Sequence, residues 1–467
     1  MRAALLLVVL CGCGPSSTHS RFGHFTVETK SDALATLSGT LRVSVGGVAA
    51  YDVQRVDERT VRFTVQGAPE TGNADIVART ASGSVKIGTL YYSAPADARL
   101  ERLVAFGASL TMGSQDASIS QRAQLMGPAA QLARATGAYL PLPLVKTGTL
   151  PALEVRDIDP VACRARDANV FEVIGSRVQA ELIEKLKDSN GDVAIAKARL
   201  DPAIEVRNVA IGGFRVSETI GGAQSFFGRV LEHLVWDAQV DSAGLVEPPK
   251  ETMIDRVVAL RPTTLLTTDL FGNDFNNVNV YAPGVPDLAP LTSTADMRAS
   301  LKAVLDRLEP LGAELFIATG PDATLLPQYD AKIAALKAEG FSDADATGWR
   351  DTLRARIGEY NAVLREEAAA RPWVHVVELA AKVDDVVQHG VEVGGAHLEG
   401  SPFGGLFSLD SMHFSDTGYA VLANLFLDAM DAAWGTKLPR VDPAEVMKAD
   451  PSSVEALRKA GLHCAGQ

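Results

Sequence analysis

The sequence predicts two domains, a small β-sandwich followed by a three-layer α/β/α domain with a mainly parallel sheet. Three observations predict this fold class. Residues 25–95 alternate apolar and polar positions between frequent turn residues, which is typical of antiparallel strands. Residues 97–438 alternate short apolar runs with longer segments of helical spacing, which is typical of βαβ units. With 467 residues, the chain is long enough for two domains or more.

The composition excludes several classes of protein. Apolar residues make up 47% of the chain and charged residues 22%, which excludes a disordered chain. The 44 Lys and Arg residues against 57 Asp and Glu residues give a net charge of −13. Because an acidic surface repels a phosphate backbone, we expect no nucleic-acid partner.

The first residues have the order of a secretory signal peptide, with a basic start, a short apolar run and small residues. The Leu-Cys-Gly-Cys motif that ends at Cys13 resembles a bacterial lipobox. This resemblance implies a signal peptide over residues 1–12, a lipid anchor at Cys13 and a polar tether over residues 13–24. Gly14 stands where Asp would mark the inner membrane, so an exported, outer-membrane lipoprotein is expected. The alternative is an ordinary signal peptide cut near Ser16–Ser17.

The first domain carries its period-two pattern in four short runs. These are residues 41–45, 61–65, 75–79 and 85–92. The Thr-Val-Arg-Phe-Thr-Val run, the Gly-Asn-Ala-Asp-Ile-Val-Ala-Arg-Thr run and a closing aromatic strand that ends at Pro95 resemble a TIG-type immunoglobulin-like domain. Such a domain is expected to be a spacer or a binding module, and no catalytic constellation falls in it.

The second domain is predicted to contain a parallel sheet covered by helices on both faces. The predicted strands are residues 103–106, 206–211, 264–270, 315–318 and 374–377. The predicted helices are residues 121–136, 298–311, 329–339, 352–370 and 416–433, before a short helical tail over residues 439–467. Because functional loops of such sheets lie at the carboxyl ends of the strands, we expect the site there.

A serine directly follows the first of these strands. Ser109 stands in the run Phe-Gly-Ala-Ser-Leu, where the glycine permits a tight turn that presents the hydroxyl to a cleft. A serine nucleophile needs a base, and the base needs a carboxylate to fix its tautomer. Asp410 and His413 supply both from one turn. Taken alone, Ser109 is more typical of a helix cap, and Ser415 or Asp416 is enough to cap the last helix, but neither explains His413.

Acyl transfer also needs hydrogen-bond donors aimed at the developing oxyanion. Two segments that follow strands contain candidates, Gly212 and Gly213 in one and Gly272 and Asn273 in the other. A glycine lets a backbone N–H approach the substrate, and an Asn side chain donates without bringing charge. Each segment alone is an ordinary loop sequence.

Together these four segments, in this order, resemble the SGNH or GDSL family of esterases and lipases, from about Leu103 to Ala433. The resemblance implies these roles: Ser109 as nucleophile, the Ser109 N–H with Gly213 and Asn273 as oxyanion hole, His413 as base, and Asp410 as its carboxylate. The resemblance also implies a serine esterase that acts through an acyl-enzyme and requires no cofactor or metal.

Gly213 is preferred to Gly212 because it lies five residues after Asn208, as in the family's second block. Two positions depart from the family pattern. Ala108 replaces the Asp of the first block, and Phe271 stands where the third block has a glycine. Neither change removes a reacting group.

The sequence predicts a carboxylic ester hydrolase that acts on a lipid or a small acyl ester. Two alternatives stay open: a non-catalytic surface scaffold with the same fold, and a polysaccharide O-acetylesterase. Export to an oxidising compartment makes a disulfide between Cys163 and Cys464 as plausible as two buried thiols.

Overall fold

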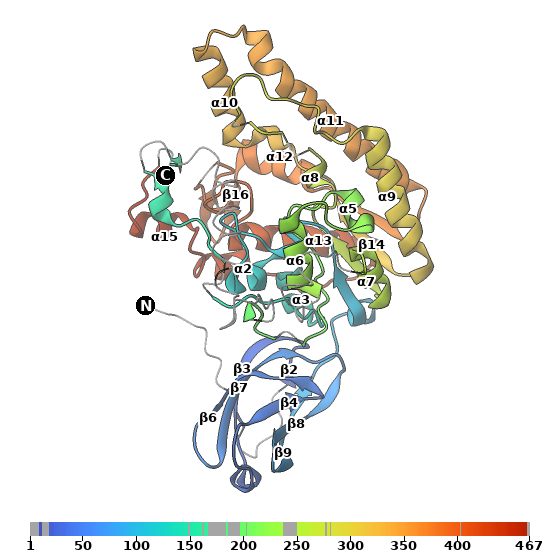
Figure 1. The fold of residues 1–467 in the computed structure, drawn as a ribbon, viewed down its shortest axis with the longest axis vertical. Coiled ribbons are helices and arrows are strands. Elements are labelled where there is room, and N and C mark those ends of the chain that lie inside the picture. Colours follow the sequence, from blue (N-terminus) through green and yellow to red (C-terminus); the bar gives the residue numbers. More distant parts are fainter. Residues whose placement is uncertain are drawn as a thin grey trace.

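The computed structural model of the chain contains a β-rich part and an α/β part, which lie one above the other in Figure 1. The residues that the structure describes are 9–11, 18–147, 150–160, 163–166, 184, 197–201, 203–236, 250–275, 278–280, 282–401 and 403–464. Cys13, the predicted lipid anchor, lies outside them.

The β-rich part consists of two sheets with strand orders β1-β3-β7-β6 and β2-β9-β8-β4-β5. The strands are β1 (Val9–Cys11), β2 (Thr18–His19), β3 (Phe22–Lys30), β4 (Arg42–Val45), β5 (Val48–Ala49), β6 (Tyr51–Arg55), β7 (Thr60–Gly67), β8 (Gly72–Thr80) and β9 (Gly83–Tyr92). Apolar side chains from alternate positions of both sheets, including Val27, Phe63, Val45 and Ile76, form one buried cluster. The two sheets therefore share a core, as in a sandwich.

The first sheet pairings begin earlier than the predicted domain boundary at residue 25. β2 and the start of β3 fall within residues 13–24, which were predicted to be a tether. This segment belongs to the fold instead, because Phe22 is buried in the core of the α/β part and His19 stacks on Phe25. β1 lies within the predicted signal peptide and pairs in parallel with β3.

The α/β part is built on a parallel sheet of strand order β10-β13-β14-β15. Its strands are β10 (Leu103–Ala105), β13 (Thr264–Thr267), β14 (Glu314–Ala318) and β15 (Val374–Val377). The predicted strand over residues 206–211 lies along the free side of β10, where the N–H of Ala105 donates to Arg207 and that of Val209 donates to Ala105, each at 2.8 Å. This segment forms an isolated parallel bridge rather than a full strand.

Helices cover both faces of this sheet. The larger ones are α3 (Pro128–Thr136), α5 (Val216–Gly221), α6 (Phe226–Trp236), α7 (Met253–Ala259), α9 (Thr294–Leu308), α10 (Pro327–Ala338), α11 (Asp343–Ala369), α12 (Leu379–His389) and α13 (Asp416–Trp434). Val104 and Phe106 belong to the core shared with α5, α7, α9 and α11, whereas Leu103 and Ala105 belong to the core shared with α3, α12 and α13. Because successive strand residues point to opposite faces, this division makes three layers.

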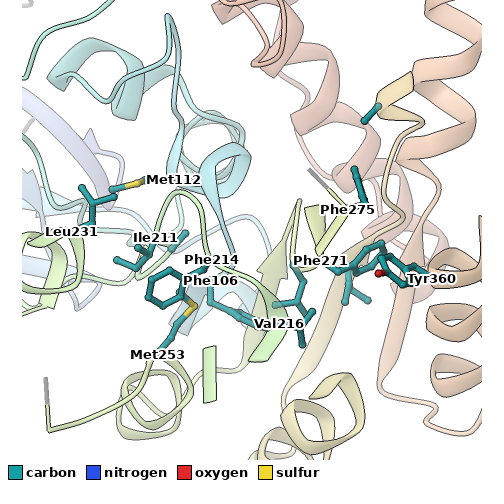
Figure 2. Close-up of a cluster of buried hydrophobic side chains, with 14 of the residues drawn as sticks. Phe106, Met112, Ile211, Phe214, Val216, Leu231, Met253, Phe271, Phe275 and Tyr360 are labelled. Atoms are coloured by element: carbon teal, nitrogen blue, oxygen red, sulfur yellow. The ribbon is translucent and has the colours of Figure 1, made fainter. Parts of the chain in front are cut away.

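Figure 2 shows part of the first of these cores. Phe106 and Phe214 lie together with Met253, and Phe271 and Tyr360 lie beside them as a second group. The rings of Phe271 and Tyr360 meet edge to face, with 6.2 Å between their centroids. This packing supports the strand ends that carry the candidate site.

Two predicted helices differ most from the observed ones, while α9 and α10 begin four and two residues before their predicted starts. The predicted helix over residues 121–136 is split into α2 (Gln121–Met126) and α3, because Gly127 is extended and Pro128, which lacks an N–H, begins a new helix. α11 begins at Asp343, nine residues before the predicted start at 352. Ser342 caps it and two acidic residues occupy its first turn, where negative charge stabilises the start of a helix. In Figure 1, α10 and α11 extend away from the sheet.

The two parts meet at an interface with buried polar groups. The Arg21 side chain is fully buried, forms an ion pair with Glu101 at 2.5 Å and donates to the carbonyl of Ala68. Gly67 has φ +90°, and a Cβ there would lie 1.9 Å from the Arg21 carbonyl, so the chain needs a glycine at this point. The N–H of Leu142 donates to the Gln66 side chain across the same interface.

The C-terminal tail is fixed to the α/β part by a disulfide and a carboxylate. Cys163 and Cys464 are bridged, with 5.6 Å between their Cα atoms, so the structure favours the disulfide over two free thiols. Asp450 accepts hydrogen bonds from the N–H and the hydroxyl of Thr417. The remaining short elements are α14 (Pro443–Met447), α15 (Val454–Lys459), β11 (Ile158–Asp159), β12 (Arg164–Ala165), β16 (Val391–Val393) and β17 (Ala396–Leu398).

Candidate functional site

Ser109 is the first residue of α1 (Ser109–Met112), a short helix that comes after β10 through a sharp turn. Gly107 makes this turn with φ +126°, and a Cβ there would lie 2.5 Å from the hydroxyl oxygen of Thr267. A residue with a side chain therefore does not fit at this position. The turn leaves Ser109 partly exposed at the carboxyl edge of the sheet.

The Asp269 carboxylate holds this turn. It accepts from the N–H groups of Ala108 at 3.1 Å, Leu110 at 2.6 Å and Thr111 at 3.1 Å, and from the Thr111 hydroxyl at 2.8 Å. The Ser109 N–H is not among these donors. Burial raises the pKa of Asp269, and the hydrogen bonds oppose the rise without cancelling it. The carboxylate thus fixes the backbone on both sides of Ser109.

His413 and Asp410 form the ion pair that their spacing predicts, with 2.7 Å between His413 Nδ1 and Asp410 Oδ2. Both side chains are buried. Asp410 Oδ1 also accepts from the N–H groups of Met412 and His413 at 2.8 Å and from the Ser408 hydroxyl at 3.1 Å. The Ala117 N–H donates to Oδ2 at 2.5 Å. With five donors around it, Asp410 is fixed in place as an acceptor.

The two partners shift each other's pKa. Burial lowers the pKa of His413, but the charge of Asp410 and the hydrogen bond to it outweigh burial, so the pKa lies above 6.5. Burial likewise raises the pKa of Asp410, but His413 outweighs it and the pKa falls below its usual value. The pair therefore favours a charged carboxylate beside an imidazole that readily accepts a proton.

Asp116 supports the turn that carries this pair. Its carboxylate accepts from the Leu409 N–H at 2.9 Å, and its own N–H donates to the Ser408 hydroxyl at 3.0 Å. Burial and the charge of Asp410 raise the pKa of Asp116 to about 7. The loop around Asp116, which comes after α1, thus joins the Ser109 segment to the His413 segment.

Ser109, Asn273 and His413 line one cavity of about 360 Å³ at the carboxyl ends of the strands. Most of its other lining residues are apolar, among them Leu110, Leu270, Phe275, Val383, Phe407 and Phe414. A volume of this size is within the range of small-molecule sites in proteins. The cavity lies between the two cores of the α/β part, because its wall takes residues from both of them.

The structure brings both candidate oxyanion segments near Ser109. A Cβ on Gly212 would lie 3.7 Å from Ser109 Cβ, so Gly212 lies beside the serine. Gly213, the glycine preferred from the sequence, has φ +87° and is not among the residues that line the cavity. Asn273, in α8 (Gly272–Phe275), lines the cavity, and its amide donates to the Phe214 carbonyl at 3.0 Å. An amide nitrogen carries two hydrogens, so this bond is compatible with a second one to a substrate oxygen.

Both departures from the family pattern have a physical reason. Ala108 is fully buried and its N–H donates to Asp269, so an Asp at position 108 would bury a second carboxylate next to the first. Phe271 is buried against Tyr360. A Cβ on Gly320 would lie 2.8 Å from the Phe271 ring, so the bulky residue at 271 is accommodated by a glycine at 320.

Sequence reasoning missed Asp269 and the cavity wall. The apolar pattern places Asp269 in a strand over residues 264–270, but β13 ends at Thr267. A carboxylate at the end of an otherwise apolar run is the signal that could have found it, since burying a charge requires donors that the strand itself does not offer. Phe407 and Phe414 carry no such signal, because aromatic residues are common in any core.

Among the described residues, no group of three or more His, Cys, Asp or Glu side chains is arranged to hold a metal ion. No helix in the part of the chain that the structure describes is long and apolar enough to cross a membrane.

Comparisons with known proteins give matches among solved structures but not among protein-family models or curated sequences. No protein-family model matches the chain, and no curated protein matches its sequence. Among solved structures, the chain is similar to the crystal structure of a novel carbohydrate acetylesterase from Xanthomonas citri, with a TM-score of 0.28 and 12% sequence identity. The match covers 90% of this chain and 74% of that chain.

Proposed function

We propose that this protein is a serine-dependent carboxylic ester hydrolase of the SGNH type. One observation carries the proposal: Ser109, Asn273 and His413 line the same cavity, and His413 is paired with the buried Asp410 at 2.7 Å. A serine hydrolase needs a nucleophile, an oxyanion donor, a carboxylate and a base, and Ser109, Asn273, Asp410 and His413 offer these groups in that order along the chain.

In the proposed acylation step, the Ser109 hydroxyl gives its proton to His413 Nε2 and its oxygen attacks the ester carbonyl. Asp410 holds His413 through Nδ1 and stabilises the imidazolium that forms. The electron pair of the carbonyl moves onto its oxygen, where the Ser109 N–H, Asn273 and a backbone N–H of the Gly212–Gly213 turn donate to it. When the intermediate collapses, the C–O bond to the alcohol breaks and His413 returns the proton to the alcohol.

In the proposed deacylation step, His413 takes a proton from water, and the water oxygen attacks the acyl-enzyme. The Ser109–acyl bond breaks, the acid leaves, and the proton returns to the Ser109 oxygen. The raised pKa of His413 favours the part of each step in which the ring accepts a proton, first from Ser109 and then from water.

We also propose that the protein is exported and held at the outer membrane by a lipid on Cys13. The proposal rests on the lipobox-like motif and is tested by metabolic labelling with a palmitate analogue. Label on the wild type that is lost in Cys13→Ala supports the anchor, and an unlabelled wild type excludes it.

Hydrolysis of p-nitrophenyl esters from acetyl to palmitoyl tests the proposed activity. The wild type is expected to release p-nitrophenol, and Ser109→Ala and His413→Ala are each expected to lose at least ~10³-fold in kcat while circular dichroism shows an unchanged fold. Full activity in either variant would exclude the proposed mechanism. A folded wild type that cleaves no ester would favour the non-catalytic scaffold.

A further inference from the structure

A pair of stacked aromatic rings forms part of the wall of the cavity beside Ser109. The Phe407 and Phe414 rings are 5.0 Å apart and nearly parallel, and both line the cavity. The two residues also face each other in an isolated antiparallel bridge. The Ser408 N–H donates to the His413 carbonyl at 2.8 Å, and the Ser415 N–H donates to that of Leu406 at 2.9 Å. The pair is therefore fixed relative to His413.

A second, shallow apolar groove lies on the other side of this pair. It runs between α12 and α13 and is lined mainly by apolar residues, Leu379, Val386, Leu406, Val421, Leu422 and Leu425, with Lys382 also in its wall. Three residues, Val383, Phe407 and Phe414, line both the cavity and the groove. The two hollows are thus adjacent apolar spaces separated by one layer of side chains.

We propose that Phe407 and Phe414 form the wall that limits the length of the alkyl chain of the ester, so that the substrate is an ester with an apolar chain of intermediate length. The inference rests on the proposed ester hydrolysis and names the substrate class of the same site. An acetyl group would leave most of a cavity of about 360 Å³ unfilled, and its apolar lining gains from burying methylene groups. A chain that reaches the rings meets side chains that are 6% and 8% exposed and closely packed, so a longer chain has no space.

Removing part of the wall is expected to lengthen the preferred chain. Phe407→Ala removes one ring of the wall that the cavity shares with the groove between α12 and α13, so the end of a longer chain occupies the space that the ring leaves, beside the apolar side chains of the groove. Because a single methylene group in an apolar pocket changes kcat/KM by about tenfold or more, the effect is large enough to measure. Phe407→Leu removes less volume and is expected to give an intermediate shift, whereas Phe407→Trp is expected to shorten the preferred chain.

The test compares kcat/KM across two ester series in the full-length protein. In the first series the acyl chain of a p-nitrophenyl ester grows from acetyl to palmitoyl. In the second the alcohol of an acetate ester grows from ethyl to hexadecyl. In Phe407→Ala, the ratio of kcat/KM for the longest ester to that for the shortest is expected to rise at least ~10-fold in one series, which identifies the part of the ester that meets the wall. Val421→Ala, which changes the groove without opening the wall, is the matched control and is expected to keep the wild-type ratio.

An unchanged ratio in both series for Phe407→Ala and Phe407→Leu would overturn the inference, even if the wild type is an active esterase. A binding assay separates this failure from failure of the proposed function. The assay measures the Kd of dansyl-labelled fatty acids of increasing length for Ser109→Ala and for Ser109→Ala/Phe407→Ala. It shows whether Phe407 limits the chain length that binds, without requiring turnover. A shift toward longer chains in the double variant supports the wall even if no ester is cleaved, and identical chain preferences in the two proteins contradict it.

Discussion

His413 and His24 lie in different parts of the molecule and show how the same residue type acquires opposite properties. His413 is buried, is paired with the Asp410 carboxylate and has a raised pKa. His24, in β3, contacts the Tyr51 hydroxyl and accepts from the Gln121 amide at 3.2 Å, and burial together with the charge of Arg134 lowers its pKa to about 4. His413 also lines a cavity, and His24 joins β3 and β6 to α2. A histidine suited to proton transfer therefore differs from a structural one in its partner and its access to a cavity.

Replacing Asp410 with Asn is expected to have the largest effect on activity after loss of Ser109 or His413 themselves. An amide does not stabilise the imidazolium and favours the wrong tautomer of His413, so kcat is expected to fall roughly 10³- to 10⁴-fold. The measurement is steady-state kinetics on the best ester. His24→Gln is the control on the other histidine and is expected to keep kcat within about twofold. A comparable loss of kcat in both variants would contradict the distinction between a catalytic His413 and a structural His24.

Replacing Asp269 with Asn tests whether the turn that carries Ser109 must be held from the end of β13. An amide offers one oxygen and turns two N–H bonds toward the N–H and hydroxyl donors around it, so the backbone around Ser109 is expected to shift and kcat to fall about 10²-fold. KM is expected to change much less, because the cavity wall is otherwise kept. Thr111→Val removes one of the hydroxyl donors to Asp269, and kcat is expected to fall less than tenfold. Equal and small effects of both variants on kcat would argue against the positioning role.

The pH dependence of kcat/KM is the next prediction. A base must be neutral to accept a proton, so the rate is expected to rise with pH through an apparent pKa above 6.5, the direction in which Asp410 shifts His413. Asp116, with its pKa raised to about 7, lies in the same network, so Asp116→Asn is the control that separates the two titrations. It keeps an oxygen for the Leu409 N–H and is expected to move the midpoint only slightly. If kcat/KM no longer rises with pH in Asp116→Asn, the titration belongs to Asp116 instead of His413.

The smallest effect concerns stability and comes from His24. Its pKa is about 4 in the folded chain against 6.5 in the unfolded chain, so between these values the unfolded state binds more protons. The free energy of unfolding is therefore expected to decrease as the pH falls from 6.5 toward 4, by up to about 3 kcal/mol from this group. In His24→Gln, urea unfolding at several pH values is expected to show a shallower loss than in the wild type. Parallel pH profiles for the two proteins would contradict the lowered pKa.

The parallel sheet was predictable because its strands are local apolar runs, and four of the five predicted runs are strands near their predicted positions. The fifth, at residues 206–211, is paired beside β10 but too irregular to be a full strand. The Asp410–His413 pair could be predicted from the sequence because both residues lie in one turn. The contacts of Asp269 could not be predicted, because the residues that donate to it lie 158 to 161 positions away in the chain. Likewise, no local pattern shows that Phe407 separates a cavity from a groove.

The measurement that tests the central claim most directly is labelling of the full-length protein with a fluorophosphonate, followed by mass spectrometry of its peptides. The proposed mechanism predicts a phosphonyl adduct on Ser109 that forms at least ~10²-fold more slowly in His413→Ala and does not form on any other serine. An unmodified Ser109 in folded protein, or an adduct on a different serine, would contradict the assignment of Ser109 as the nucleophile.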